Sequence, residues 1–394
     1  MKKRPWEKRY AFARSVAKGM VIRVARKRYG FKVPKIELPD GPCLVLCNHV
    51  TTYEPLLVVA ACKKPLRAVI AKDFIRFNWR KSLQYWFSPI WKDKSLQDPS
   101  VPLAIIRSVR AGDSVLLFPE GNRTFSSRLC YISDATAKLV RSCKADVVYL
   151  NVTGGFSIDP RFSLDFRKGE MDIKMRGILK KEDIAKMSIP EIKQNIIENL
   201  TVNDVPSATP SISDKRAEKL ERVLYRCPVC HSLGHIHSEG NLVKCDSCGL
   251  EVAYGEYLTF ENPNKENFPH HELYDWFIEQ EEYVRSTSFS PEDLIYEEGD
   301  VNLEDIDLDH QTMLLEHAPI KMFGSKLVVG DRVFPFEEIA EIAVSGKQTF
   351  LFYSEGITYR VSSSIVGWNP LKYMQMFYHI RNKTSGQDDS FLGI

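Results

Sequence analysis

Two short apolar runs, each followed by a polar turn, stand out in the first half of the chain. Residues 43–47 and 114–118 are mostly apolar and are bounded by turn-forming residues, which predicts two buried strands. The turns that follow, at 48–54 and 119–124, hold histidine, carboxylate, glycine and arginine residues. Because α/β proteins place their chemistry where strands end in such turns, we expect an α/β domain with a central sheet flanked by helices.

The N-terminal segment shows a different pattern, with apolar side chains at helical spacing among many cationic ones. The apolar positions are Trp6, Tyr10, Ala13, Ala17, Met20 and Val24. Residues 1–32 carry a single acidic residue, Glu7, although the net charge of the whole chain is only +3. A basic amphipathic helix with a leading tryptophan is typical of an interfacial membrane anchor, and we expect residues 1–34 to form such an arm. The pattern also fits a helix that packs on the core, or one that binds nucleic acid.

The rest of the pattern predicts further helices, a linker and a set of short strands. Helical spacing indicates a helix at 189–200, and Ser, Thr, Pro and Asp are enriched at 201–214, which predicts a linker. A second helix is expected at 271–280, followed by a solvated loop over the acidic stretch 291–309. Towards the end of the chain, short apolar runs alternate with turns and give way to a helix at 370–381, which predicts a small, mainly β domain.

The chain shows no sign of a membrane span or a secretion signal. No apolar run approaches the roughly 18–20 residues that a span requires, and the N-terminus lacks the apolar core of a signal peptide. The nine cysteines then fit a reducing compartment. We therefore expect a cytoplasmic protein, attached peripherally to the inner face of the membrane.

Four of the cysteines form a metal-binding pattern. Cys227 and Cys230 make one C-x2-C pair, Cys245 and Cys248 make another, and fourteen residues separate the two pairs. This spacing is typical of a zinc ribbon, in which two short turns bring four thiolates into a tetrahedron around a structural Zn2+ ion. Four thiolates fill the coordination sphere and leave no open position for catalysis. The alternative is a chance pairing of free thiols.

The turn after the first apolar run offers a base and a carboxylate. His49 is suited to accept a proton at neutral pH, and Glu54 can fix its tautomer and stabilise the imidazolium that forms. A separation of five residues on a regular helix would place the two side chains about 140° apart. They can meet only if a loop precedes the helix, and Pro55 favours a helix that begins near Glu54. We predict that His49 and Glu54 are the catalytic pair.

The turn after the second run offers groups that bind anions. Arg123 can hold a phosphate through two parallel hydrogen bonds. The backbone amides of Gly121 and Asn122 can stabilise an oxyanion or a phosphate oxygen. Together the two turns suit the transfer of a group between a phosphorylated acceptor and an activated carbonyl.

The pair of motifs resembles that of the glycerophospholipid acyltransferase superfamily, especially the 1-acylglycerol-3-phosphate acyltransferases. That family carries a His-x4-Asp motif and, further along the chain, a Phe-Pro-Glu-Gly-x-Arg motif. This sequence has His49-x4-Glu54 and then residues 118–123 in the same order. The resemblance covers residues 35–200, about half of the chain.

The resemblance also implies roles for individual residues. Glu120 and Gly121 would help to bind the acyl acceptor. Lys94 stands where family members often carry a phosphate-binding arginine, and it keeps the charge without the guanidinium fork. The sequence departs from the family at Glu54, which is usually aspartate, and at Tyr149, which replaces a proline.

The strands and helix at the end of the chain look like a pleckstrin-homology-type barrel, and the whole layout is similar to bacterial acyltransferases with a zinc ribbon and a trailing domain. The predicted organisation is a basic helical arm at 1–34, an acyltransferase domain at 35–200, a linker at 201–221, a zinc ribbon at 222–262, a helix and acidic linker at 263–310, and a pleckstrin-homology-like domain at 311–394.

The resemblance implies an enzyme of phospholipid biosynthesis. A fatty acyl group would pass from acyl-CoA or acyl-ACP to a lysophospholipid, in the first place from 1-acyl-glycerol-3-phosphate to phosphatidic acid, with His49 as general base. The expected partners are the lysophospholipid, the acyl thioester, the membrane surface and, for an ACP donor, acyl carrier protein. No nucleic acid is expected, because the ribbon lacks a dense basic and aromatic surface. The alternatives are another lysolipid acceptor, or a non-catalytic lipid-sensing regulator whose ribbon binds protein or nucleic acid.

Overall fold

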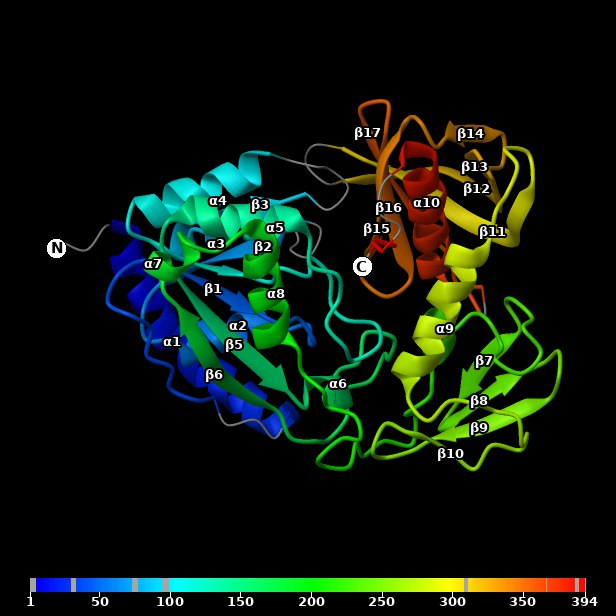
Figure 1. Cartoon of the computed structure of the whole chain (residues 1–394), viewed down its shortest axis with the longest axis horizontal. Helices are drawn as coiled ribbons and strands as arrows, with labels where there is room; N and C mark the ends of the chain where they lie inside the picture. Colours follow the sequence, from blue (N-terminus) through cyan, green and yellow to red (C-terminus); the bar gives the residue numbers. More distant parts are fainter. Residues whose placement is uncertain are drawn as a thin grey trace.

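The computed structural model describes residues 5–29, 33–72, 77–93, 99–307, 311–365, 367–386 and 390–393. Lys94, a predicted phosphate ligand, lies outside these described residues. The described chain builds three β-sheets of six, four and seven strands, one after another along the sequence. In Figure 1 the six-stranded sheet and its helices occupy one half of the molecule, and the other two sheets lie in the other half.

The six-stranded sheet has the order β3-β2-β4-β1-β5-β6, and its pairs are parallel except for β5–β6. Its strands are β1 (Cys43–Cys47), β2 (Leu66–Ala71), β3 (Ile90–Lys92), β4 (Ser114–Leu117), β5 (Asp146–Thr153) and β6 (Asp172–Leu179). Both strands predicted from the apolar runs form, as β1 and β4, and they are direct neighbours. Parallel pairing places the turns that follow them at the same edge of the sheet.

Helices cover both faces of this sheet. They are α2 (Glu54–Ala61), α3 (Phe77–Phe87), α4 (Ser100–Arg110), α5 (Asp134–Cys143), α6 (Gly155–Ile158), α7 (Lys181–Ile184) and α8 (Ile189–Leu200). On one face Val45 of β1 shares a buried cluster with Leu57 of α2, and on the other Leu46 shares one with Ile105 of α4. Because successive strand residues point to opposite faces and both faces are covered, β1 is buried throughout and its sequence is continuously apolar.

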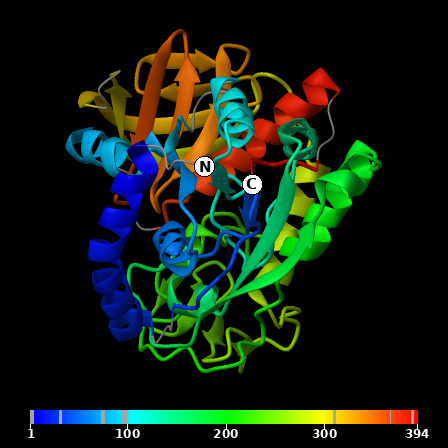
Figure 2. The ribbon, with the colours of Figure 1, turned by 90° about the vertical axis from the view of Figure 1, so that its left-hand side faces the viewer.

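The predicted N-terminal helix forms as α1 (Pro5–Tyr29) and runs along one side of the domain (Figure 2). Tyr10 is buried, with its ring centroid 5.5 Å from that of Phe87 in α3. Arg14 donates hydrogen bonds to the carbonyls of Val59 and Ala60, at the end of α2. The helix is thus packed on the domain rather than extended away from it. Among the described residues, no helix is both long enough and apolar enough to cross a bilayer.

The four-stranded sheet is antiparallel, in the order β10-β9-β8-β7. Its strands are β7 (Ile236–Glu239), β8 (Leu242–Cys245), β9 (Leu250–Tyr254) and β10 (Phe260–Glu261), and the short helix η2 (Leu220–Arg222) precedes them. All four strands fall within the range predicted for the ribbon. Helix α9 (Leu273–Ser286) follows and is longer at its C-terminal end than the helix predicted at 271–280.

The acidic stretch that we predicted as a solvated loop is instead strand β11 (Leu294–Ile306), which pairs with β12 and β17. The prediction of a linker here was wrong, and the C-terminal sheet begins earlier than expected. Tyr296 and Val301 are both buried, but a bulge lies between them. The bulge interrupts the alternation of apolar and polar residues by which a strand is recognised in a sequence. Cross-strand cations accommodate the charge, as where Arg360 lies 2.7 Å from Glu304.

The remaining C-terminal strands follow the predicted runs. They are β12 (Thr312–Phe323), β13 (Lys326–Val329), β14 (Arg332–Pro335), β15 (Ile339–Ser345), β16 (Thr349–Ser354) and β17 (Ile357–Ser362). The sheet is antiparallel throughout, in the order β14-β13-β12-β11-β17-β16-β15. Helix α10 (Pro370–Ser385) packs on β15 and β16 and ends later than the predicted residue 381.

Residues 201–221, predicted as a linker, are packed as well. Val205, Ala217 and Leu220 are buried. The backbone N–H groups of Ser207 and Ser211 bond to carbonyls of the ribbon at 2.8 Å each. One buried cluster runs through loops of the first domain, the ribbon and the C-terminal sheet. The ribbon and the C-terminal sheet therefore share one hydrophobic core, which loops of the first domain join, while the six-stranded sheet has its own buried clusters. Sequence composition alone did not reveal the packing of 201–221 because the segment is rich in polar turn formers.

Candidate active site

The turn after β1 brings the two predicted catalytic residues together. His49 Nδ1 lies 2.8 Å from Glu54 Oε2. The other carboxylate oxygen of Glu54 accepts the backbone N–H groups of Val50 and Thr51, at 2.7 Å each. The chain is a loop until α2 begins at Glu54, as Pro55 predicts. The side chain of His49 is 19% exposed, so the ring is not sealed from solvent.

Glu54 itself is fully buried, and this changes its chemistry. Burial raises the pKa of its carboxyl from 4.5 to about 8, against the lowering effect of the N–H groups of Thr51 and Val50. The carboxyl of Glu54 therefore exchanges its proton near neutral pH, beside the ring nitrogen of His49.

Glu120 of the second motif braces the same turn. Its Oε1 accepts the backbone N–H of His49 at 2.6 Å, and its Oε2 accepts that of Cys130 at 2.9 Å. Burial raises the pKa of Glu120 to about 8. Thr124 donates its backbone N–H to the carbonyl of His49 at 2.9 Å. The second motif thus fixes the backbone of His49 on both sides.

Arg123 joins the two motifs. Its Nε donates to the carbonyl of Val50 at 3.2 Å, and its Nη1 donates to Thr52 Oγ1 at 2.6 Å. Its Nη2 lies 3.3 Å from the carboxylate of Asp159 and also donates to the Asp159 carbonyl. A guanidinium has five N–H groups, and these contacts leave one on Nη1 without a partner among the described residues. The side chain is 13% exposed.

The rest of the second motif forms a tight turn. Gly121 has a φ of 70° and donates its N–H to the carbonyl of Phe118 at 3.1 Å. The amide predicted to bind an oxyanion therefore already has a partner. The side chain of Asn122 bonds to the carbonyl of Gly393, at 3.4 Å, and accepts from Arg161 at the same distance.

Two lysines that sequence reasoning missed lie at this edge of the sheet. Lys92 ends β3, and a Cβ placed on Gly121 would lie 3.8 Å from its Nζ. Lys72 directly follows β2 and pairs with Asp93 at 2.7 Å. The signal that could have found them is their position at the ends of two apolar runs, which parallel strands bring to one edge. The edge thus offers positive charge beside the second motif.

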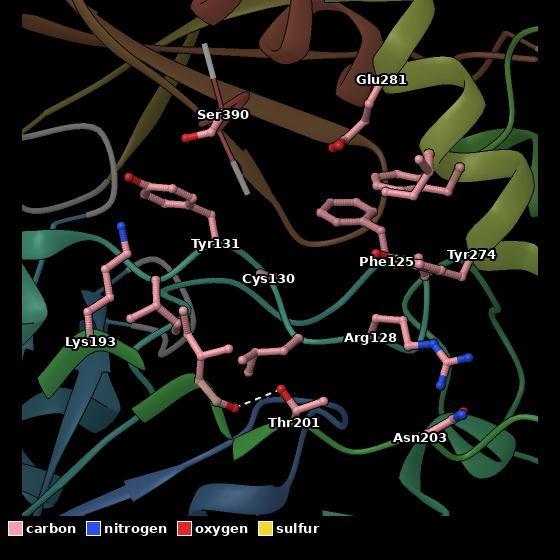
Figure 3. A pocket seen from close by; sticks show the side chains of 16 residues that line it. Phe125, Arg128, Cys130, Tyr131, Lys193, Thr201, Asn203, Tyr274, Glu281 and Ser390 are labelled. Atoms are coloured by element: carbon pink, nitrogen blue, oxygen red, sulfur yellow. Dashed lines mark hydrogen bonds between the residues drawn. The ribbon is translucent and has the colours of Figure 1, made fainter. Parts of the chain in front are cut away.

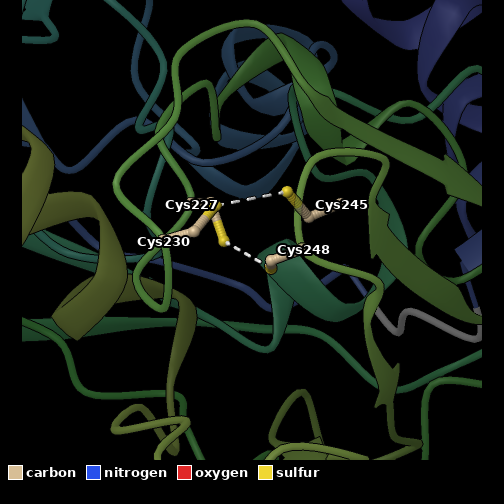
Figure 4. A group of neighbouring side chains, drawn as sticks. All are labelled: Cys227, Cys230, Cys245 and Cys248. Carbon is tan, nitrogen blue, oxygen red and sulfur yellow. Dashed lines mark hydrogen bonds between the residues drawn. The ribbon is translucent and has the colours of Figure 1, made fainter.

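The four predicted metal ligands also converge (Figure 4). Their sulfur atoms all lie within 4.8 Å of one another. The Sγ atoms of Cys227 and Cys248 are 3.8 Å apart, as are those of Cys230 and Cys245. A tetrahedron with Zn–S bonds of about 2.3 Å has sulfur–sulfur edges of about 3.8 Å, so this donor set fits Zn2+.

A separate cavity of about 610 Å³ lies between the loop after the second motif, α8 and α9 (Figure 3). Phe125, Ile197 and Phe277 give it a largely apolar wall. Cys130, whose N–H binds Glu120, lies in the same wall. The cavity therefore lies next to Glu120, which holds the His49 turn, although His49 does not line it.

Residues 30–153 match the model of the family described as Acyltransferase. This match covers about a third of the chain, within its N-terminal domain, and confirms the resemblance drawn from the two motifs. The matched range ends before Asp159, so the match does not cover every residue that holds the turn.

Two solved structures are similar to parts of the chain. The 1-acyl-sn-glycerophosphate (LPA) acyltransferase PlsC from Thermotoga maritima is 13% identical with a TM-score of 0.38, over 48% of this chain and 78% of that one. The N-terminal PH domain of human ARAP2 is 11% identical with a TM-score of 0.20, over 25% of this chain and 88% of that one. Neither score is high enough to carry an argument about fold or function. No curated protein matches the sequence.

Proposed function

We propose that the protein is an O-acyltransferase that moves a fatty acyl group from an acyl thioester to the free hydroxyl of a lysophospholipid. The preferred acceptor is 1-acyl-glycerol-3-phosphate, which gives phosphatidic acid, and the donor is acyl-CoA or acyl-ACP. The observation that carries the proposal is the His49–Glu54 pair, whose backbone is fixed by Glu120 and Thr124. Fixing the base from several sides is what general base catalysis requires of a protein.

The reaction needs one proton to move twice. His49 Nε2 accepts the proton of the acceptor hydroxyl while the oxygen attacks the thioester carbonyl. The tetrahedral intermediate then loses the thiolate, and the imidazolium returns the proton to it, which leaves an ester and a free thiol. Glu54 stabilises the imidazolium between these steps. The transfer is direct, with no acyl-enzyme.

The cations around the second motif support a phosphorylated acceptor. We propose that the remaining N–H of Arg123 and the ammonium of Lys92 face the phosphate, with Gly121 and Asn122 shaping the turn between them. Glu120 contributes by holding the turn rather than by touching the ligand, because both of its oxygens accept backbone N–H groups. A phosphate role for Lys94 stays a prediction.

The test is a product assay with purified full-length protein. Lysophosphatidate and radiolabelled acyl-CoA or acyl-ACP are expected to give labelled phosphatidic acid, and lysophosphatidylcholine is the matched acceptor whose phosphate carries a choline. His49→Ala is the catalytic control. Folded protein that binds lysophosphatidate but yields no product with either donor would favour the non-catalytic sensor instead.

We also propose that α1 and α3 form the membrane-facing surface. Phe12 and Val16 of α1 are 62% and 64% exposed, and Trp79 and Tyr85 of α3 are 66% and 53% exposed. Exposed aromatic side chains beside many cations are typical of a surface that lies on anionic lipid. The side chains of Ala17, Met20 and Val24, which belong to the predicted stripe, lie outside those that the structure describes.

Vesicle co-sedimentation tests this surface. Phe12→Ser combined with Val16→Ser is expected to weaken binding to anionic vesicles several-fold, and higher salt is expected to shrink the difference between anionic and neutral vesicles. Leu103→Ser is the control, because Leu103 is 49% exposed on α4 at the other face of the sheet. Equal sedimentation of all three proteins would place the membrane contact elsewhere.

We propose a structural Zn2+ ion at Cys227, Cys230, Cys245 and Cys248. The donor set and the sulfur spacing support it. The ion would join the two turns of the ribbon and take no part in the transfer, since four thiolates complete its coordination.

A further inference from the structure

A third segment, to which the sequence assigned no role, holds the two motifs together. Residues 155–163 are buried without interruption. The segment begins directly against the catalytic turn, since a Cβ placed on Gly155 would lie 2.9 Å from Thr51 Cγ2. It continues through Asp159 and Arg161, whose charged side chains are both almost fully buried. Charged groups are rarely buried without specific partners, and both of these side chains have them.

Asp159 holds the side chain of Arg123 and the first motif at once. Its Oδ2 accepts the backbone N–H of Thr52 at 2.8 Å and lies 3.3 Å from Arg123 Nη2. Its backbone carbonyl accepts a second bond from the same nitrogen of Arg123. The guanidinium is therefore oriented by Asp159 and not by the solvent.

Arg161 holds the backbone of the same residue. Its Nη1 donates to the carbonyl of Arg123 at 2.9 Å and lies 3.4 Å from Asn122 Oδ1. Its guanidinium carbon lies 3.9 Å from the ring centroid of Phe125, which fixes the plane of the group. Arg123 is thus held at its side chain by Asp159 and at its carbonyl by Arg161.

The C-terminal sheet completes this arrangement. Nη2 of Arg161 donates to the carbonyl of Val344 in β15 at 3.0 Å. Lys347, in the turn between β15 and β16, donates its Nζ to the carbonyl of Ser163. The guanidinium of Arg161 therefore connects the second motif to the C-terminal sheet, through Val344, which lies 183 positions after Arg161.

We propose that Asp159 and Arg161 are positioning residues for the acceptor-binding turn at 121–123, and that the C-terminal β domain supports Arg161 through Val344 and Lys347. This inference rests on the proposed function, since it takes the turn to bind the acceptor phosphate. In the His49–Glu54 pair, Glu54 accepts the N–H groups of Val50 and Thr51, and His49 donates its backbone N–H to Glu120; these bonds do not involve Arg161. Loss of Arg161 should therefore weaken acceptor binding more than it slows the chemical step.

Steady-state kinetics of the full-length protein test this, with lysophosphatidate and acyl-CoA each varied. Arg161→Ala is expected to raise the acceptor KM about tenfold while the donor KM and kcat change by about twofold or less. Arg161→Lys should recover part of the loss, because an ammonium can still bond the Arg123 carbonyl. Asp159→Asn should raise the same KM, because the amide keeps an acceptor for Thr52 but loses the charge that faces Arg123.

Arg167→Lys is the matched control. Arg167 is equally buried, but its guanidinium donates to the carbonyl of Arg216 and lies over the ring of Phe162. Its replacement should lower the melting temperature without raising the acceptor KM. Lys347→Ala tests the support by the C-terminal domain and should raise the acceptor KM by a smaller factor than Arg161→Ala.

Each outcome decides one question. Suppose that wild type acylates lysophosphatidate and that the Arg161 variants give a smaller yield of active protein with an unchanged acceptor KM. Arg161 is then merely structural, and the inference is overturned while the proposed function stands. If Arg161→Ala does not fold, Arg161→Lys and Lys347→Ala give the same comparison. If wild type acylates no lysophospholipid, the proposed function fails and the inference fails with it.

Discussion

The His49–Glu54 turn, which we propose to be catalytic, and the cysteine cluster both come from short sequence motifs, but the molecule holds them in different ways. The four cysteines lie at two turns, one before β7 and one between β8 and β9, and Cys227 and Cys248, the ends of the set, are 21 positions apart. His49 is held by Glu54 from its own turn and by Glu120 from 71 positions further along the chain. The comparison teaches that residue spacing suffices to recognise a site built from one short segment. Where distant elements hold the site, only the fold shows which residues support it.

The largest effect is expected from removing His49, the proposed base. His49→Ala should reduce the rate of phosphatidic acid formation by about 2–4 powers of ten. The fold should survive, because alanine keeps the backbone N–H that Glu120 accepts. Initial rates and melting temperature measure the two effects. Glu54→Asp should retain more activity than Glu54→Gln, since only aspartate keeps a carboxyl that can take up and release a proton beside His49. Wild-type turnover by folded His49→Ala protein would show that another group is the base.

Arg123→Ala tests the link between the two motifs. We expect a loss of about 2–3 kcal/mol in transition-state stabilisation, with the acceptor dependence affected more than the donor dependence. The melting temperature should fall too, because the side chain ties Val50 and Thr52 to Asp159. A raised donor KM with an unchanged acceptor KM would assign Arg123 to the donor.

Cys245→Ser tests the other site of the comparison, the cysteine cluster. Elemental analysis of wild type should find about one zinc per chain, and the variant should lose most of it and unfold more easily at the ribbon. The folded variant should keep catalysis within a few-fold. Cys143→Ser is the control, because Cys143 is a buried thiol outside the cluster. If zinc-free, folded protein lost all turnover, the zinc would take part in catalysis, contrary to our proposal that its role is structural.

The smallest effect that we predict is a pH dependence of stability from the two buried carboxyls. Burial raises the pKa of Glu54 and of Glu120 from 4.5 to about 8. Between these values the folded chain binds protons that the unfolded chain has lost. Their stabilising contribution is therefore complete below pH 4.5 and is lost as the pH rises through about 8.

Thermal unfolding in a series of buffers measures this dependence. The melting temperature should fall between about pH 5 and pH 8, and the fall should be shallower for Glu120→Gln, which cannot ionise. A wild-type curve as shallow as that of the variant would mean that Glu120 does not titrate in this range.

The sequence predicted the main residues of the candidate site but not the residues that hold them in place. His49, Glu54 and Arg123 were found because each follows an apolar run, and strand ends are where α/β proteins place chemistry. Asp159 and Arg161 were missed because they belong to no short motif, and their contacts with Arg123 exist only once β5 lies beside β1. The packing of 201–221 and the strand at Leu294–Ile306 were missed because polar and acidic residues masked buried positions there.

The sequence by itself determined the elements whose signals are local: the continuously apolar strands, the helix that starts at Glu54 beside Pro55, and the two C-x2-C turns. Only the tertiary structure decided which of these elements meet. Strand order placed the ends of β1, β3 and β4 at one edge, and the shared core set the C-terminal sheet against Arg161. The physical reason is that local backbone preferences act over a few residues, whereas burial of a common apolar surface depends on the whole chain.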